Sequence, residues 1–167
     1  MHIVVLSFSN LATDQRVNRQ IRILAEEHRV TAVGCAPPGI PGVDFVPASI
    51  LPRSLSGRVI TVAQMLFRLE DMRPRGDRYG HDVLARLSAL DADLFVANDL
   101  EPLPLALSVA GERPVILDAH EYYPRRFEDR LSWRFLRNPY YAYQCRLLIP
   151  RAAAMITVCQ GLAEQYT

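Results

Sequence analysis

A histidine flanked by carboxylates is the most chemically suggestive segment of this sequence. His120 stands one residue beyond the apolar run 114–119, with Asp118 two residues before it and Glu121 directly after it. In this position an imidazole can accept a proton, donate a hydrogen bond to a hydroxyl group, or carry positive charge beside a developing negative one. Alternatively, His120 caps the following helix or packs beneath the neighbouring tyrosines. The local sequence does not separate these two interpretations.

Other short apolar runs also end in polar residues. The exits of the predicted strands are 7–10, 98–101, 120–123 and 159–160, and the first three are dense in hydrogen-bonding side chains. A polar loop is the ordinary expectation at any one exit. Because ligands bind beyond the carboxyl ends of the strands in an open parallel sheet, three such exits on one edge predict a pocket. Its candidate lining residues are Ser9, Asn10, Asn98, Asp99, Asp118, His120 and Tyr122.

The first of these exits argues against a dinucleotide cofactor. Residues 7–12 contain no glycine, so the glycine fingerprint that wraps the pyrophosphate of NAD is absent. The helix that follows begins with Asp14, Arg16 and Arg19, and its N-terminal dipole favours an anionic group. A solvated helix face is the alternative explanation for Arg19.

Short apolar runs alternate with longer amphipathic stretches along the chain, which predicts an α/β fold with a doubly wound, mainly parallel sheet. The expected strands are 3–6, 30–33, 43–46, 94–97, 114–119 and 153–158. Expected helices are 14–27 with Thr13 as the N-cap, 58–69, 78–90, one after Pro102, 127–149 with a kink or break near Pro139, and one from 161.

Composition narrows the class of protein. The 167 residues carry a net charge of +1, whereas a dedicated nucleic-acid binder shows a strongly basic face. The apolar runs are too short to span a bilayer, and no signal peptide is recognisable, so we expect a cytoplasmic protein. The three cysteines form no CxxC pair and the four histidines have no ligand spacing, so we expect no metal site.

One region departs from this even charge balance. Residues 122–151 hold seven arginines against two acidic residues, a local net charge of +5, together with most of the tyrosines and the single tryptophan. Core packing beneath a solvated arginine face accounts for this pattern. Peripheral attachment to an anionic membrane surface, such as the inner face of the cell membrane, is the alternative.

Several segments together resemble the N-terminal domain of the family 4 retaining glycosyltransferases, which have the two-Rossmann-domain architecture called GT-B. The matching segments are 14–19 (DQRVNR), 98–105 (NDLEPLPL), 117–121 (LDAHE), 151–158 (RAAAMITV) and 162–164 (LAE). They occur in the family's order, and the resemblance extends over nearly the whole chain except 35–90. It implies that residues 1–167 form a Rossmann-like acceptor-binding domain, the N-terminal half of a GT-B fold.

This resemblance also assigns roles. It implies transfer of a sugar from a nucleotide diphosphate-sugar to a hydroxyl acceptor with retention of configuration, without a metal or cofactor in this domain. His120 takes the position of the family's active-site histidine, Asp99 and Glu121 become acid/base candidates, and Asn98 lines the pocket. Ser9 and Asn10 stand where many members have glycines beside the donor phosphates.

The matching segments include no donor-binding motifs, so the resemblance implies a C-terminal donor-binding domain that is absent from this chain. We therefore expect the 167 residues to be inactive alone and to self-associate weakly through the apolar surface that meets that domain. A nucleotide-sugar 2-epimerase shares the two-domain architecture and is an alternative. A non-catalytic half-domain that binds a partner or a sugar is another.

Overall fold

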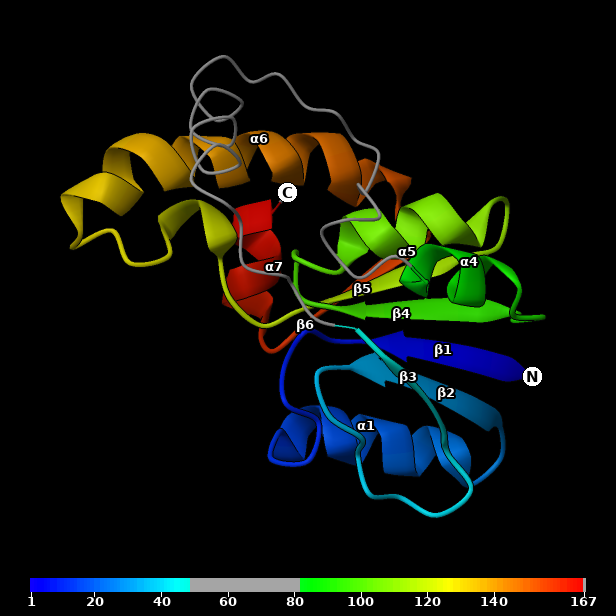
Figure 1. The fold of residues 1–167 in the computed structure, drawn as a ribbon. Helices are drawn as coiled ribbons and strands as arrows, with labels where there is room; N and C mark the ends of the chain where they lie inside the picture. Colours follow the sequence, from blue (N-terminus) through cyan, green and yellow to red (C-terminus); the bar gives the residue numbers. More distant parts are fainter. Residues whose placement is uncertain (49–81, 167) are drawn as a thin grey trace.

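The computed structural model describes residues 1–48 and 82–166. At its centre lies a sheet of six parallel strands in the order β3-β2-β1-β4-β5-β6 (Figure 1). Its strands are β1 (His2–Leu6), β2 (Arg29–Gly34), β3 (Asp44–Pro47), β4 (Leu94–Asn98), β5 (Val115–Ala119) and β6 (Ala154–Thr157). The predicted α/β class and the doubly wound parallel sheet are confirmed.

Helices connect the strands on both sides of the sheet. They are α1 (Gln15–Ala25), α4 (Val83–Ser88), α5 (Leu103–Ala110), α6 (Asn138–Leu148) and α7 (Gln160–Tyr166). Shorter helical turns are η1 (Tyr123–Arg125), η2 (Trp133–Arg137, with π-helical geometry) and η3 (Ile149–Arg151). None of the helices in these two described ranges is long and apolar enough to span a membrane.

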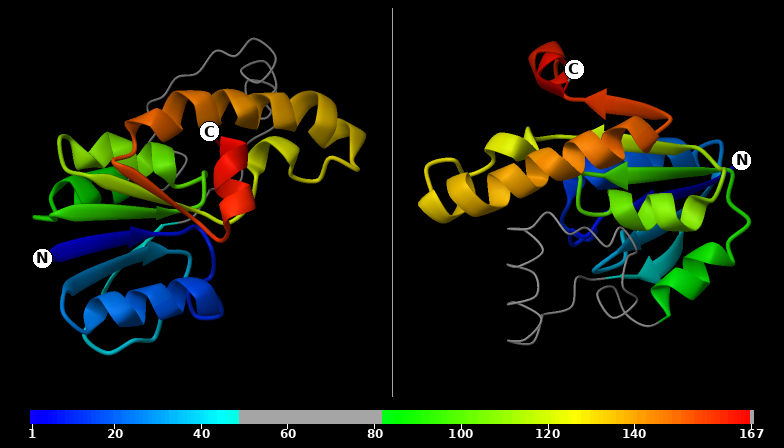
Figure 2. Two further views of the ribbon diagram at one scale, coloured as in Figure 1. Left: turned by 180° about the vertical axis from the view of Figure 1, so that it is seen from behind. Right: turned by 90° about the horizontal axis from the view of Figure 1, so that it is seen from above.

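Two apolar clusters fill the space between the sheet and the helices, one on each face of the sheet. On one side of the sheet, α1 packs on Ile3 and Val5 of β1, whereas Val4 and Leu6 of the same strand join the cluster beneath α4, α5 and α6. Figures 1 and 2 show α1 on one side of the sheet and α4, α5 and α6 on the other. Since β1 is buried along its whole length, its continuous apolar run is what a strand covered on both faces requires.

Two predicted boundaries were wrong. Asp14, not Thr13, is the N-cap of α1, and its carboxylate accepts a hydrogen bond of 3.1 Å from the backbone of Val17. Helical structure begins at Leu131 rather than at residue 127 and then continues through η2, α6 and η3 to Arg151. The π-helical stretch ends two residues before Pro139, where a kink or break is predicted. The predicted helix 58–69 and the start of the helix 78–90 lie outside the described residues.

The end of β2 holds the loop after β1 close to the sheet. A Cβ atom on Gly34 would lie 2.8 Å from the side chain of Leu11 and 2.9 Å from the carbonyl oxygen of Ser7. Only glycine therefore permits this approach without displacing backbone. The contact fixes the first strand exit at the same sheet edge as the exits of β4 and β5.

Candidate functional site

The exits of β4 and β5 meet the N-terminal turn of α1 in a network of polar side chains. Arg16 donates from Nη2 to Asp99 Oδ2 at 3.2 Å and from Nη1 to Asn98 Oδ1 at 3.4 Å. The backbone N–H of Asp99 donates to the carbonyl oxygen of Asp118 at 2.9 Å. The structure thus brings together the predicted residues Arg16, Asn98, Asp99 and Asp118, as the convergence of strand exits predicts.

Gln20 completes this network, and the sequence analysis did not identify it. Its Nε2 donates to Asp118 Oδ2 at 2.9 Å, and its Oε1 accepts from Asn98 Nδ2 at the same distance. The signal that could have found it is the spacing of four residues from Arg16, which places both side chains on one helix face. Gln20 therefore links α1 to the ends of two strands.

His120 lies at the same sheet edge, directly after β5. Its Nε2 is 2.9 Å from Asp118 Oδ1, and its backbone N–H donates to Asp99 Oδ1 at 3.3 Å. The histidine side chain is 18% exposed and the Asp118 side chain 11%, so their mutual attraction is poorly screened. Nε2 is buried and its close contact with Asp118 lies outside hydrogen-bond geometry, so the two side chains form an ion pair when the imidazole is protonated.

Asp99 is the carboxylate best suited to exchange a proton. Burial raises its pKa from 3.8 to about 6, and the carboxylates of Glu101 and Glu121 add to the rise, while Arg16 and Arg126 oppose it. Its backbone lies in the left-handed region at φ 75°, an uncommon conformation for a residue other than glycine. Such conformations occur at functional sites, where surrounding contacts hold them in place.

The pKa of Asp118 is also raised. Burial is the largest cause, and the charge of Arg16 and the hydrogen bond from Gln20 act in the opposite direction. Arg16 and Gln20 thus favour the ionised form of Asp118, and that form attracts a protonated His120. The network can therefore hold a proton at either of the two carboxylates.

Glu121, the other predicted acid/base residue, faces a different cluster. Its Oε2 lies 2.8 Å from Nε of Arg126, and its side chain is 52% exposed. Arg126 also reaches Glu101 Oε1 at 3.2 Å, and the buried Tyr123 donates its hydroxyl hydrogen to the same carboxylate. Glu121 is thus held in an ion pair beside the network and does not contact His120 through any hydrogen bond of its side chain among the described residues.

Tyr122 and the C-terminal helix close this second cluster. The ring of Tyr122 meets that of Tyr166 edge to face, with 5.1 Å between centroids. The Tyr166 hydroxyl accepts from the backbone N–H of Tyr123 at 3.2 Å and donates to the carbonyl oxygen of Glu121 at 2.6 Å. The α7 helix therefore fixes the backbone directly after His120.

The polar side chains of the loop after β1 form hydrogen bonds within that loop and with the first turn of α1. Ser9 Oγ lies 2.9 Å from Ser7 Oγ, Asn10 Oδ1 accepts from the backbone of Ala12 at 3.0 Å, and Asp14 caps α1. None of these contacts joins Ser9, Asn10 or Asp14 to the His120 network. Of the three, Asn10 is exposed and the other two are half-buried.

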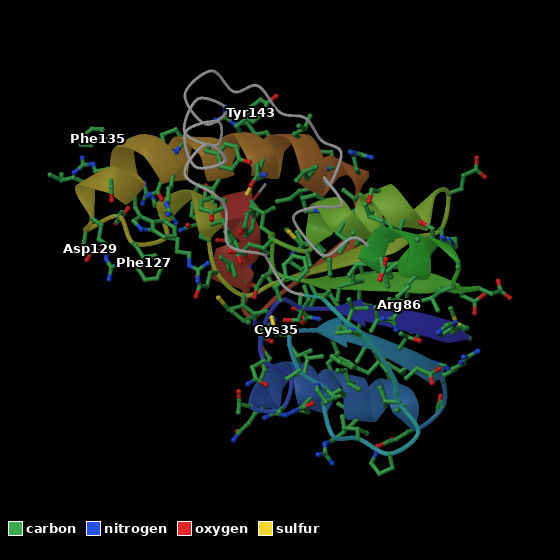
Figure 3. All side chains as sticks on the ribbon, in the orientation of Figure 1. Cys35, Arg86, Phe127, Asp129, Phe135 and Tyr143 are labelled. Carbon is green, nitrogen blue, oxygen red and sulfur yellow. The ribbon has the colours of Figure 1, made fainter. Side chains whose placement is uncertain are left out.

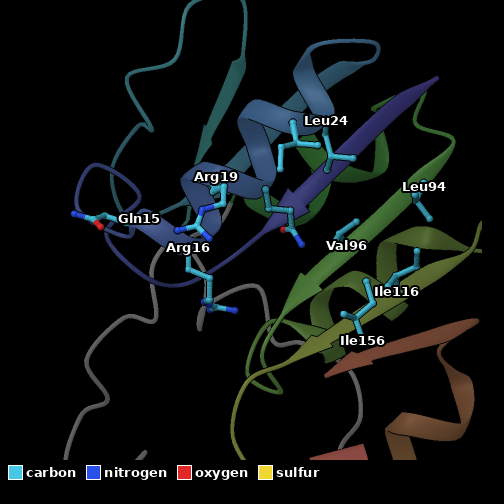
Figure 4. A pocket seen from close by; sticks show the side chains of 10 residues that line it. Gln15, Arg16, Arg19, Leu24, Leu94, Val96, Ile116 and Ile156 are labelled. Carbon is cyan, nitrogen blue, oxygen red and sulfur yellow. The ribbon is translucent and has the colours of Figure 1, made fainter. Parts of the chain in front are cut away.

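An elongated hollow of about 670 Å³ begins at this network and continues over the α1 side of the sheet. Arg16, Arg19 and Gln20 form its polar end, and the strands supply an apolar floor of Leu94, Val96, Ile116 and Ile156 (Figure 4). Ile23 and Ile156 at its border are 59% and 50% exposed. The described chain therefore leaves apolar surface of β4, β5 and β6 uncovered on this side. Within that same described part, no group of three or more His, Cys, Asp or Glu residues is arranged to hold a metal ion.

No protein-family model and no curated protein matches the sequence. Among solved structures, this chain is similar to the glycotransferase of kitacinnamycin, at 19% identity and a TM-score of 0.50. The fold is that of a Rossmann-like α/β domain. The alignment covers 94% of this chain but only 45% of the glycosyltransferase, so the chain spans less than half of that neighbour. A short-chain dehydrogenase/reductase from Burkholderia vietnamiensis aligns at 10% identity and a TM-score of 0.42, with 97% of this chain and 85% of that chain covered, and this similarity is too low to carry an argument.

Proposed function

We propose that this chain is the acceptor-binding domain of a cytoplasmic glycosyltransferase that transfers a sugar from a nucleotide diphosphate-sugar to a hydroxyl acceptor with retention of configuration. The observation that carries the proposal is the strand-end network, in which the His120 imidazole lies 2.9 Å from the Asp118 carboxylate and the His120 backbone N–H donates to Asp99 Oδ1. The ordered sequence segments and the fold-level similarity to a glycosyltransferase add support.

In the proposed reaction, the bond between the anomeric carbon and the diphosphate oxygen breaks, and a bond from that carbon to the acceptor oxygen forms. The acceptor hydroxyl passes its proton to the Asp99 carboxylate, and the nucleoside diphosphate departs with the electrons of the broken bond. The His120 imidazole contacts the reacting groups and orients them, while Asp118, 2.9 Å from Nε2, stabilises the imidazolium form. Asp99, with a pKa of about 6, exchanges a proton near neutral pH. Arg16 and Gln20 hold the two carboxylates in place.

We further propose that a separate C-terminal domain binds the donor and meets the charge of the leaving diphosphate. The 45% coverage of the neighbouring glycosyltransferase supports this division of labour. The apolar hollow beside α1 would then face a companion domain rather than water, because large apolar surface is rarely left exposed. The domain needs no cofactor of its own in this scheme.

The experiment compares the protein expressed from its complete gene with the 167-residue chain. Both are incubated with a panel of nucleotide diphosphate-sugars and hydroxyl acceptors, and nucleoside diphosphate release and glycosylated product are measured. We expect transfer by the complete protein and none by the 167 residues alone. Interconversion of donor sugars without an acceptor would instead identify a 2-epimerase. Absence of any turnover across the panel would favour a binding module, and no observation described above favours either alternative.

A further inference from the structure

One end of the molecule carries exposed apolar side chains far from the strand-end network. The segment 125–137, which we name the projecting segment, extends beyond the sheet ahead of α6 (Figure 1). Within it, Phe127 is 43% exposed, Leu131 71% and Phe135 72%. Leu131 and Phe135 are four residues apart in a helical stretch and therefore share one face.

Positive charge surrounds these apolar side chains. The projecting segment holds five arginines, Arg125, Arg126, Arg130, Arg134 and Arg137, against Glu128 and Asp129, a net charge of +3. Arg126 is engaged by Glu101 and Glu121, whereas the other four form no ion pair among the described residues. Without Arg126, the four remaining arginines exceed Glu128 and Asp129 by two charges, and no ion pair among the described residues neutralises them.

The free guanidinium groups lie against aromatic rings. Arg130 stands over Phe127 with 5.1 Å to the ring centroid, Arg134 over Phe135 at 5.8 Å, and Arg137 over Trp133 at 4.5 Å. Figure 3 places Phe135 on one side of this end of the molecule, and Phe127 and Asp129 on the other. The face with Phe135 thus combines apolar side chains with the guanidinium group of Arg134 and is turned away from Asp129.

We propose that the projecting segment docks on an anionic membrane surface. Leu131 and Phe135 enter the boundary between head groups and acyl chains, and the free arginines pair with lipid phosphates. The interface of an anionic bilayer places negative head groups directly above an apolar interior, so it can bind the arginines and bury the apolar side chains of this face at the same time. Nucleic acid fits less well: a base can stack on Phe135, but the highly exposed Leu131 finds no apolar environment there. The proposal is independent of the glycosyltransferase function.

The test is co-sedimentation of the 167-residue chain with vesicles. We expect binding to vesicles of phosphatidylcholine and phosphatidylglycerol in equal parts, much weaker binding to pure phosphatidylcholine, and weakening by salt. The double variant Leu131→Ser with Phe135→Ser should lose at least about tenfold in affinity, because two inserted apolar side chains are removed. Arg134→Gln with Arg137→Gln should lose about fivefold per arginine.

Matched controls on another face are Ile23→Ser and Arg22→Gln, which remove an exposed apolar side chain and an exposed arginine of α1. Both should bind the anionic vesicles like the unchanged chain. The proposal is overturned by equal binding to both vesicle types, by loss in the controls equal to that in the variants, or by no binding at all. Size-exclusion chromatography adds a further outcome: a dimer abolished by the Leu131 and Phe135 changes would make a second copy the occupant instead.

Discussion

The raised pKa of Asp99 can be tested through the pH dependence of the free energy of unfolding. Its pKa of about 6 in the folded chain compares with 3.8 for an unperturbed aspartate, and burial is the main cause. The difference corresponds to about 3 kcal/mol at most, at 1.36 kcal/mol per pKa unit. The side chain is 26% exposed, so little of this is lost to solvent screening.

The sign follows from proton binding. Between pH 3.8 and 6 the folded chain binds the Asp99 proton more tightly than the unfolded chain does. The contribution of Asp99 to stability is therefore fully present below pH 3.8, falls as the pH rises through about 6, and stays at its lower level above that.

Asp99→Asn removes this titration while preserving most of the geometry. Asparagine tolerates the positive φ and keeps an oxygen for the backbone N–H of His120, although it loses the charge that pairs with Arg16. Relative to the unchanged chain, the variant should gain about 2 to 3 kcal/mol of unfolding free energy between pH 4 and pH 7. Comparing two pH values cancels any cost that does not depend on pH.

Urea unfolding followed by circular dichroism at each pH provides the measurement. Val17→Ala is the control, because it removes buried methyl groups from α1 and should lower stability by the same amount at every pH. If the unfolding free energies of Asp99→Asn and the unchanged chain differ by the same amount at every pH from 4 to 7, Asp99 does not have the raised pKa on which its proposed role depends.

Two further predictions concern packing and thiol reactivity. Gly34→Ala should lower the unfolding free energy by about 1 to 3 kcal/mol in urea, because its Cβ would meet Leu11 and neighbouring backbone, and an unchanged midpoint would contradict that contact. Burial raises the pKa of Cys145 to about 12, whereas Cys35 and Cys159 are exposed, so iodoacetamide at neutral pH should label the latter two and leave Cys145 unlabelled. Mass spectrometry of the labelled native chain checks this, and early labelling of Cys145 would show that it is accessible.

Local patterns predicted most of the fold. The apolar runs at 3–6, 94–97 and 114–119 became strands because buried parallel strands need apolar side chains on both faces. The start of the helical stretch at Leu131 was not predictable from periodicity, since arginines and aromatics recur from residue 125 onward at spacings that suit either a helix or packed turns. The N-cap of α1 is Asp14 rather than Thr13, a difference of one residue, and sequence patterns do not place helix ends that finely.

The candidate site shows the same limit. Adjacency of strand ends follows from topology, so the grouping of Asp99, Asp118 and His120 was predictable from the sequence. The direction in which each side chain points was not predictable from the sequence. Gln20 belongs to the network because its face of α1 lies over the ends of β4 and β5. Glu121 does not belong to it, because its carboxylate pairs with Arg126. These outcomes depend on contacts between segments far apart in the sequence.

The central claim is that His120 acts on the reacting groups. Its most direct test is the transfer rate of the protein from the complete gene with His120→Ala, measured beside His28→Ala, a histidine outside the network. We predict that kcat/KM falls by about 100-fold or more for His120→Ala, with an unchanged circular dichroism spectrum, and stays near normal for His28→Ala. Near-normal transfer by a folded His120→Ala protein would contradict the claim.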